Sequence, residues 1–568
     1  MKGFLLTVVL VVALFLGIAV KHGDVQLPTI APISLPSTPT TAARQTAGHA
    51  FTPNQYNITS SIEWLWDQNG VYRLDPGSNM ARELLDDRGL PITQVQGLTY
   101  SLRGEALTDF YVWIWSAGAV FRYQPTGELV RVQDAAAHDM AGVQGLLVVP
   151  HPLADDRVWF WTATQLYEVV EVSGRVQAQP LTPSVAGIQA AKVTPDARYV
   201  WLWNAANLFI YDLQQGQIVS ILNSGNAGLN GIQHLLIQPG NASDVSQYTV
   251  WAWNQVDLFR FPFPATTWPP RPEKMVNDQG GGINHVQGIW FTQLPGGQPQ
   301  TWVWTPWQLF QLQNNRALPV VLGAGDVAMT GVHGVTACPS APYLYVWNAH
   351  HLFQIGLADG IARPMVRPDG SALFNGLRRV IACPTSDTGA ELWAWDSEGV
   401  YRQIGQGQQT RPVLTQLGHN LADVRGMMVG QYRQGQEVWL WSGAGVFQYQ
   451  PTEDRMKEMV GPDGMSLANV WMVMMRPDKT EHERGYTVLL RHERGVFQFT
   501  AGNPRPVAVT SAGRPIVSPP PSTENLGLVV VGHDAFSVPL AWPQTTLNMM
   551  MQKDGSAAAI ITAYATPR

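Results

Sequence analysis

The residue types that most often carry catalysis are present, but their spacing builds no recognisable site. The chain has 13 histidines, and the adjacent pair His350-His351 would point apart on the two sides of a hairpin. No HExxH, phosphate-loop or G-x-S-x-G pattern occurs, and no calcium-loop spacing. Acid pairs such as Asp86-Asp87 lie in loop-like segments, where we expect solvated carboxylates. The sequence therefore predicts no catalytic residue, no metal ligand and no cofactor.

The two cysteines are the one pair whose positions allow a specific bond. Cys338 and Cys383 both follow alanine and precede proline, about one repeat apart. In an exported protein a disulfide can form between them if their Cα atoms come within about 7 Å. Alternatively, they are two small buried side chains, because the inner strands of neighbouring repeats usually diverge.

Tryptophan carries the main pattern of the sequence. Pairs of aromatic residues two positions apart recur about every 46 residues, and Phe or Tyr always stands six residues after the second member. The nine pairs are Trp64/Trp66, Trp113/Trp115, Trp159/Trp161, Trp201/Trp203, Trp251/Trp253, Trp302/Trp304, Tyr345/Trp347, Trp393/Trp395 and Trp439/Trp441. Leu489/Arg491 and Leu528/Val530 are two degenerate copies with the same offset to Phe497 and Phe536.

Each copy can be divided into four short strands. An apolar segment such as 143–149 precedes the pair, the pair itself lies on a second strand, the Phe or Tyr on a third, and a segment such as 128–132 forms a fourth. Asn, Ser, Asp and Gly fill the interval between the second and third strands, as in a tight hairpin. This unit length and strand content predict all-β propeller blades.

Residues i and i+2 of a strand share a face, so both tryptophans of a pair point the same way. They could form a ring of exposed ligand pockets, or they could pack between neighbouring blades. Seventeen of the 22 tryptophans follow the repeat, as a requirement of the core would produce. We therefore expect packing.

Two repeat families resemble this pattern. The strings VWLWNAANLFIYD (200–212) and VWAWNQVDLFRF (250–261) are similar to tectonin repeats of lectin-like propellers. The segment 369–403 resembles the repeats of two-component-regulator propellers, although a second tryptophan replaces the Gly-Thr that normally follows there. The resemblance covers roughly residues 55–540 and implies a propeller fold; it carries over no ligand residue.

Nine clear and two degenerate copies predict ten or eleven four-stranded repeats over 51–545. That number exceeds the usual four to eight blades, so the chain forms either one wide ring or two tandem propellers. A seam between two propellers would fall near 261–275, where the Pro-rich insert 261–272 follows the fifth pair. The tail 546–568 could close the last blade.

Tryptophans that depart from the repeat are candidates for function. Trp268 stands between prolines in the insert, and Trp307 stands beside Pro306 in a hairpin. Either could contact a partner, or Trp268 could fold back on the blade edge. Trp290 and Trp471 fall on inner strands, where we expect core positions.

The N-terminus reads as an export or anchoring segment. Residues 4–20 are apolar except for Thr7 and Gly17, which predicts a signal peptide or a signal anchor within 1–22 that would form a hydrophobic helix. A pilin-type leader is a third interpretation of this apolar segment. The Pro/Thr/Ser-rich stretch 23–50 then reads as a linker. All three readings place the remaining chain outside the cytoplasm, in the periplasm or at the cell surface, tethered to the membrane if the segment is not cleaved.

Net charge and composition limit the classes of partner that the chain can be expected to bind. The formal net charge is −6 and only 14% of residues are charged, which gives no reason to expect nucleic acid as a partner. We expect a non-enzymatic binding scaffold for an envelope or extracellular protein. A lectin-like propeller that binds a glycan is the alternative, and a lyase or hydrolase with a site in the channel is a third possibility. The sequence does not set the oligomeric state.

Overall fold

The computed structural model describes most residues between 47 and 564. Undescribed within that range are 55–56, 68, 75–78, 104–105, 125, 152–153, 240–245, 294–298, 321–329, 338–341, 368, 372–373, 383–390, 405–408, 433–434, 451–452, 471, 481–482, 501–505, 517–525, 534–543 and 552–556. The N-terminal helix of 1–22, most of the linker, both cysteines and Trp471 lie outside the described residues. No apolar helix of membrane-spanning length occurs in the described part of the chain.

Ten antiparallel four-stranded blades follow one another along the chain. The first five consist of β1 (Ala47–Asn54), β2 (Asn57–Asp67), β3 (Val71–Leu74), β4 (Met80–Glu83); β5 (Val95–Arg103), β6 (Ala106–Ser116), β7 (Val120–Tyr123), β8 (Leu129–Val132); β9 (Val143–Val149), β10 (Arg157–Thr162), β11 (Leu166–Val172), β12 (Arg175–Pro180); β13 (Ala190–Val193), β14 (Tyr199–Trp203), β15 (Leu208–Asp212), β16 (Gln217–Ser220); β17 (His234–Pro239), β18 (Tyr248–Trp253), β19 (Leu258–Phe263) and β20 (Glu273–Asn277).

The other five consist of β21 (Gly288–Gln293), β22 (Pro299–Trp304), β23 (Leu309–Gln313), β24 (Arg316–Pro319); β25 (Gly334–Ala337), β26 (Tyr343–Trp347), β27 (Leu352–Gly356), β28 (Ala362–Pro364); β29 (Arg379–Ala382), β30 (Glu391–Trp395), β31 (Val400–Ile404), β32 (Arg411–Pro412); β34 (Val424–Tyr432), β35 (Gly435–Ser442), β36 (Val446–Gln450), β37 (Arg455–Met459); β38 (Met472–Thr480), β39 (Glu483–His492), β40 (Gly495–Thr500) and β41 (Val507–Ser511). Two short strands, β33 (Leu414–Thr415) and β42 (Arg514–Pro515), add to the edges of blades 9 and 10.

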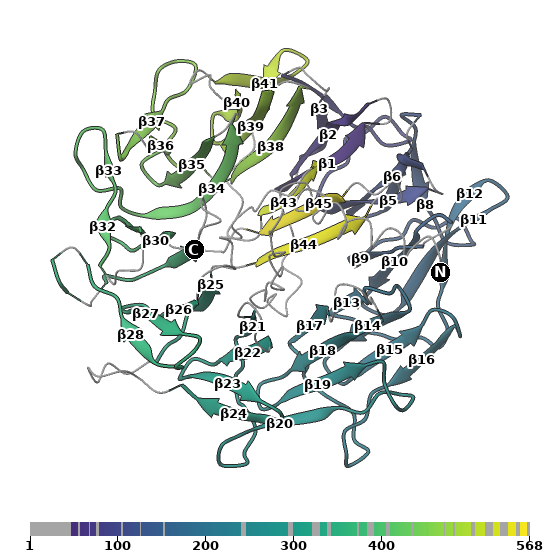
Figure 1. Cartoon of the computed structure of the whole chain (residues 1–568). Helices are drawn as coiled ribbons and strands as arrows, with labels where there is room; N and C mark the ends of the chain where they lie inside the picture. The colour runs from purple at the N-terminus through teal and green to yellow at the C-terminus, as the bar shows by residue number, and fades with distance from the viewer. Residues whose placement is uncertain are drawn as a thin grey trace, which may run out of the picture.

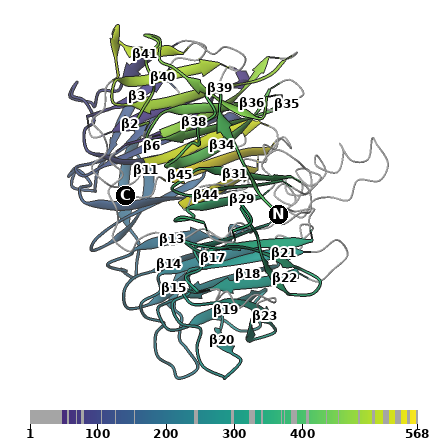
Figure 2. The same cartoon turned by 90° about the vertical axis from the view of Figure 1, so that its left-hand side faces the viewer.

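The blades stand in one ring, with the first strand of each blade nearest the axis and the fourth strand at the rim (Figure 1). Figure 2 shows the same ring turned by 90°. Blade 10 meets blade 1: β41 pairs in parallel with β4, and Leu489 of β39 packs in one core cluster with Leu65 of β2. Blades 5 and 6 share a continuous core, so no seam between two propellers separates them. The chain is therefore a single ten-bladed β-propeller.

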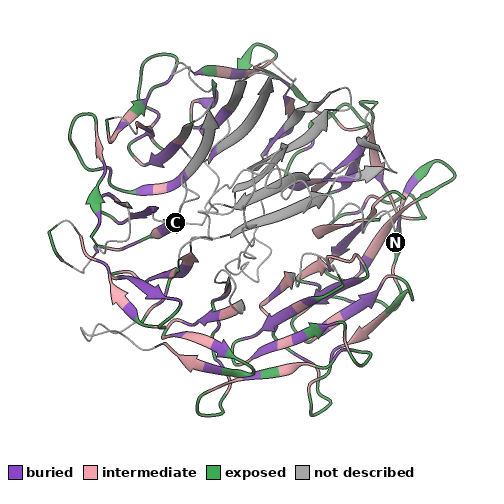
Figure 3. Cartoon of the chain, viewed as in Figure 1, coloured by how far each residue is buried: buried purple, intermediate pink, exposed green. Residues whose placement is uncertain are grey.

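The paired indoles pack between successive blades, so the packing prediction is confirmed. Trp201 and Trp203 of blade 4, for example, lie in one cluster with Val250 and Phe261 of blade 5. Sixteen of the paired tryptophans are at most 6% exposed: Trp64, Trp66, Trp113, Trp159, Trp161, Trp201, Trp203, Trp251, Trp253, Trp302, Trp304, Trp347, Trp393, Trp395, Trp439 and Trp441. Figure 3 shows buried positions along the blade strands and exposed ones at the turns.

Glycine on the first strand makes room for the second indole of the pair. Gly97, Gly145, Gly288, Gly334 and Gly426 each stand opposite that tryptophan in the strand register. A Cβ built on any of the five would lie 2.1–2.4 Å from an indole carbon. The indole thus lies directly over the backbone of the first strand, and only glycine permits that approach.

The last strands of the chain do not form an eleventh blade. β43 (Leu526–His533), which carries the second degenerate pair, aligns in parallel with β1 and antiparallel to β45 (Ala557–Tyr564). β44 (Gln544–Met551) pairs with the other edge of β45. Blade 10 already has four strands of its own, and the C-terminal strands extend the sheet of blade 1 instead.

Candidate functional site

The ring has two ends that differ in the turns they carry. We call the end with the hairpins between second and third strands, and with the connections from each blade to the next, the connection face. The other end carries the first-to-second and third-to-fourth turns, and we call it the opposite face. This division follows from four antiparallel strands per blade.

In eight blades, a polar residue directly after the second member of the pair fixes the hairpin of the connection face. In blade 5 the Asn254 Oδ1 accepts the N–H groups of Val256 and Asp257, at 3.0 and 2.8 Å, and its Nδ2 donates to the Asn230 carbonyl. Side-chain oxygens of Ser116, Thr162, Asn204, Thr305, Asn348, Asp396 and Ser442 accept hairpin N–H groups in the same way. These Asx and Ser/Thr turns make the hairpins stiff supports for whatever side chain stands at their tips.

Two neighbouring hairpins of the connection face present exposed apolar side chains. Trp307 of blade 6 is 56% exposed and Val256 of blade 5 is 55% exposed. His285 joins the two hairpins: its N–H donates to the Gln255 carbonyl at 2.7 Å, and its ring lies edge-on to the Trp307 indole, 5.1 Å between centroids. Trp307 is thus held on a rigid turn with its ring turned to solvent. We call Val256, His285 and Trp307 the blade 5–6 patch.

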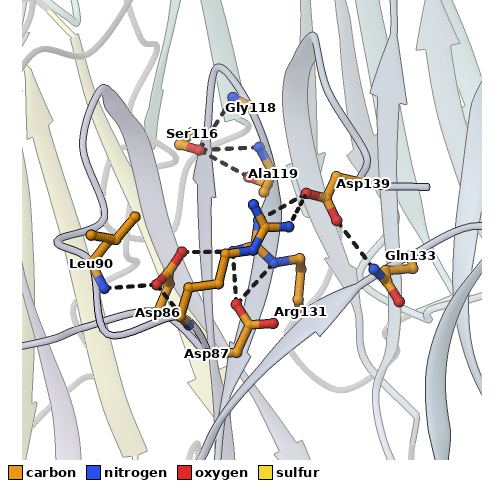
Figure 4. Close-up of polar contacts among 10 residues, drawn as sticks. Asp86, Asp87, Leu90, Ser116, Gly118, Ala119, Arg131, Gln133 and Asp139 are labelled. Atoms are coloured by element: carbon orange, nitrogen blue, oxygen red, sulfur yellow. Dashed lines mark hydrogen bonds and ion pairs between the residues drawn. The ribbon is translucent and has the colours of Figure 1, made fainter. Parts of the chain in front are cut away.

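A charged cluster occupies another part of the connection face, between blades 1 and 2. The buried Arg131 guanidinium contacts Asp86, Asp87 and Asp139, at 2.7, 2.7 and 3.0 Å (Figure 4). It also lies over the Phe121 ring. Burial alone would raise the pKa of Asp86, but the N–H groups of Leu90 and Arg88 and the Arg131 charge together hold it below its usual value.

The expectation of a solvated carboxylate is therefore wrong for Asp86, whose side chain is 11% exposed, but not for Asp87, which is 47% exposed although it also contacts Arg131. Arg131 forms ion pairs with both acids, and this ion cluster links the connection between blades 1 and 2 to blade 2. In the described residues, no three His, Cys, Asp or Glu side chains come together as metal ligands.

Basic side chains replace glycine on the first strands of two blades. His234 stands opposite Trp253, and Arg379 stands opposite Trp395. Burial, and then the charge of Lys192 on neighbouring β13, lowers the pKa of His234 to about 3. Burial lowers the pKa of Lys192 to about 8 and that of Arg379 to about 9. Sequence reasoning missed these groups, although His234 and Arg379 both replace the glycine of the repeat. Lys192 stands opposite Trp201 instead.

Trp268 lies on the opposite face, at the third-to-fourth turn of blade 5. Its ring stacks on Tyr199 of blade 4, with 5.2 Å between centroids and 23° between planes, yet 38% of the residue stays exposed. The structure therefore does not bring Trp268 and Trp307 together: they stand on opposite ends of the ring. Trp290 lies on inner strand β21 and packs, partly buried, against the core between blades 6 and 7.

The Cys338–Cys383 disulfide and its alternative, two small buried side chains, both stay predictions, because the two cysteines lie outside the described residues. The strands that precede the two cysteines, β25 and β29, are the inner strands of adjacent blades 7 and 8.

No protein-family profile matches the chain, and no curated protein matches it by sequence. Solved structures match over much of its length at low identity. One is the extracellular domain of a putative hybrid two-component system of B. thetaiotaomicron, with 11% identity, 84% of this chain and 72% of that chain covered, and a TM-score of 0.25. Another is PorZ, a surface component of the type-IX secretion system of Porphyromonas gingivalis (12%, 91% and 78%, TM-score 0.26). A third is Saccharomyces cerevisiae Sqt1 (9%, 61% and 92%, TM-score 0.35). The fold assignment rests on the strand topology described above.

Proposed function

We propose that this propeller is a binding scaffold outside the cytoplasm and that its blade 5–6 patch holds a protein partner of the cell envelope. The observation that carries the proposal is the exposed indole of Trp307 beside exposed Val256. The paired tryptophans with described burial are almost all enclosed between blades, whereas this one is presented to solvent by a capped hairpin.

The side chains of the blade 5–6 patch are of the kind that protein-binding sites contain. Tryptophan on a rigid support loses little conformational freedom on binding, and large aromatic residues dominate the energetics of protein interfaces. Two apolar side chains on adjacent hairpins extend the contact beyond a single ring. We therefore expect the partner to contribute an apolar side chain that packs between the Trp307 indole and Val256.

Affinity capture from envelope extracts tests the partner contact. The full chain should retain one envelope protein reproducibly, and Trp307→Ala and Val256→Ser should each weaken its purified complex by about tenfold, or about 1.4 kcal/mol. Trp268→Ala, on the other end of the ring, is the matched control and should bind as the unaltered chain does. A partner that binds Trp307→Ala with unchanged affinity would refute the patch as the binding site. Self-association of the chain through the patch would refute an envelope partner and identify a second copy as the ligand.

A reporter fusion tests the location separately. The apolar segment 4–20 and the linker after it support export of the propeller. Alkaline phosphatase fused after Arg568 should be active in cells, and deletion of residues 4–20 should abolish that activity. Equal activity with and without the segment would contradict an extracytoplasmic scaffold.

A further inference from the structure

The indole of Trp268 is fixed in place although more than a third of the residue is exposed. It stacks on Tyr199, which is itself 7% exposed and contacts Phe263 at 5.6 Å between ring centroids. Trp268 of the insert 261–272 is therefore not buried in the core. One side of the indole is supported by an aromatic ring, and the remaining surface faces solvent as a flat, rigid platform.

Arg198 provides hydrogen-bond donors beside the same aromatic stack. Its guanidinium carbon lies 4.9 Å from the Tyr199 ring centroid, and the side chain is 44% exposed. Within the described part of the chain, the guanidinium makes no hydrogen bond and its ion pair is with Asp212, at 3.8 Å. A guanidinium has five N–H donors, so most of those of Arg198 are open to a ligand.

The surroundings of Trp268 differ from those of Trp307. Of the exposed large hydrophobic residues in the described chain, Trp268 is the one on the opposite face of blades 4 and 5. Its neighbours Thr266, Thr267 and Pro269 are exposed. Trp268 has no second exposed apolar side chain beside it, such as Val256 provides near Trp307, so it offers less for a protein partner's apolar contact. A single exposed aromatic face, with the Arg198 guanidinium against the Tyr199 ring that supports it, fits a ligand that is apolar on one face and rich in hydroxyl groups at its edge.

We propose that Trp268 and Arg198 form a carbohydrate-binding subsite on the opposite face of the propeller. The C–H groups on one face of a pyranose ring stack on the Trp268 indole, because the face of an aromatic ring carries negative charge and attracts them. Arg198 donates hydrogen bonds to ring hydroxyls, or to a carboxylate where the sugar is a uronic acid. The aromatic support of Tyr199 holds the platform in place before the sugar arrives, which reduces the entropic cost of binding.

Titration of the full chain with β-1,4-linked hexasaccharides of glucose, N-acetylglucosamine and galacturonic acid tests the subsite by calorimetry and tryptophan fluorescence. At least one hexasaccharide should bind. Trp268→Ala should weaken its affinity about tenfold or more, whereas Trp268→Tyr should retain most of it. Arg198→Gln should weaken it by about fivefold, with the larger loss for the galacturonate if the guanidinium meets a carboxylate.

Trp307→Ala is the matched control and should leave sugar affinity unchanged. The melting temperature of each variant separates loss of the subsite from loss of the fold, and the tyrosine variant keeps the test valid if the alanine variant is unstable. Binding of none of the three probes, or equal binding by a folded Trp268→Ala variant, would overturn the subsite. Failure here leaves the protein partner at Trp307 unaffected, because the two proposals use different residues and opposite ends of the ring.

Discussion

At the scale of single residues, the blade depends on a contact between one glycine and one indole. Trp115 lies so close to the backbone at Gly97 that a Cβ there would come 2.1 Å from its ring. The same arrangement recurs in four more blades, and the glycine is therefore a packing requirement set by the indole.

Gly97→Ala should destabilise the propeller by about 1–3 kcal/mol, because the indole must shift within a filled interface. Chemical denaturation of the variant measures the loss. Gly118→Ala is the matched control, since a Cβ at Gly118 meets nothing within 4 Å, and it should change stability by less than about 0.5 kcal/mol. Equal effects of the two substitutions would contradict the role of the glycine.

Lys192 should make stability depend on pH. Burial lowers its pKa from 10.5 to about 8, so below that pH the folded protein carries the cost of the buried charge in full. As the pH rises from about 8 towards 10.5, the folded state loses the proton first and the cost disappears. Lys192→Met should therefore raise the free energy of unfolding by about 1–2 kcal/mol near pH 7, less than full burial implies because the side chain is partly exposed.

Denaturation of the methionine variant and the unaltered chain at several pH values checks this prediction. The difference between the two should shrink as the pH approaches about 10. Lys274→Met serves as control, because Lys274 is exposed and contacts Asp257 at 2.7 Å, and it should bring no gain. A constant difference at all pH values would mean that the lysine acts through packing and not through its charge.

At the scale of elements, the hairpins of the connection face depend on the residue after the pair. Asn348 accepts N–H groups of His350 and His351 and donates to the Thr330 carbonyl, with 6% of the residue exposed. Asn348→Ala should destabilise the fold by about 1–2 kcal/mol, because it leaves these buried groups without partners. Asn348→Asp retains the acceptor and loses only the donor, so thermal denaturation should show a smaller loss. Equal losses would assign the stabilisation to the Thr330 contact alone.

The spacing of the aromatic residues predicts the strands well because every blade repeats the same local packing and the same hairpin length. The offset from Trp203 to Phe209 indicates the length of the hairpin. Trp201 and Trp203 lie two positions apart, which indicates that they share one buried face of the strand. Contacts between non-equivalent loops have no such period. Arg131 meets Asp86 and Asp87 only because the ring places one blade connection against the next blade, so no local pattern could have revealed that cluster.

The same reasoning explains what the sequence could not decide about the candidate sites. Trp268 and Trp307 both depart from the repeat beside a proline, and nothing in their neighbours distinguishes a stacked ring from an open one. The difference arises from a distant partner: Tyr199 belongs to another blade than Trp268. The number of rings likewise depends on whether the first and last blades meet.

At the scale of the whole molecule, the ring is closed by an interface without the indole pair. Leu489 and Arg491 stand where other blades have aromatic residues, and the buried Arg491 donates through Nη1 to the Trp66 carbonyl of blade 1, at 3.0 Å. Strands β41 and β4 pair across the junction. We expect this junction to open more easily than the other blade interfaces, because Leu489 and Arg491 bury less aromatic surface there than the indoles that fill the others.

Arg491→Met should loosen the junction without unfolding the blades. The methionine is apolar and of similar length, so it retains part of the packing but loses the hydrogen bond to Trp66, at a cost of about 1–3 kcal/mol. Because local openings report local stability, hydrogen–deuterium exchange should accelerate in β4 and β41 and stay unchanged in β15, which lies across the ring. Arg494→Gln removes an ion pair with Asp463 and a hydrogen bond to the Ser466 carbonyl, neither of them with blade 1, and should leave both regions as they are. Faster exchange in every blade would mean that the ring opens as one cooperative unit, and no change at β4 would remove Arg491 from the closure.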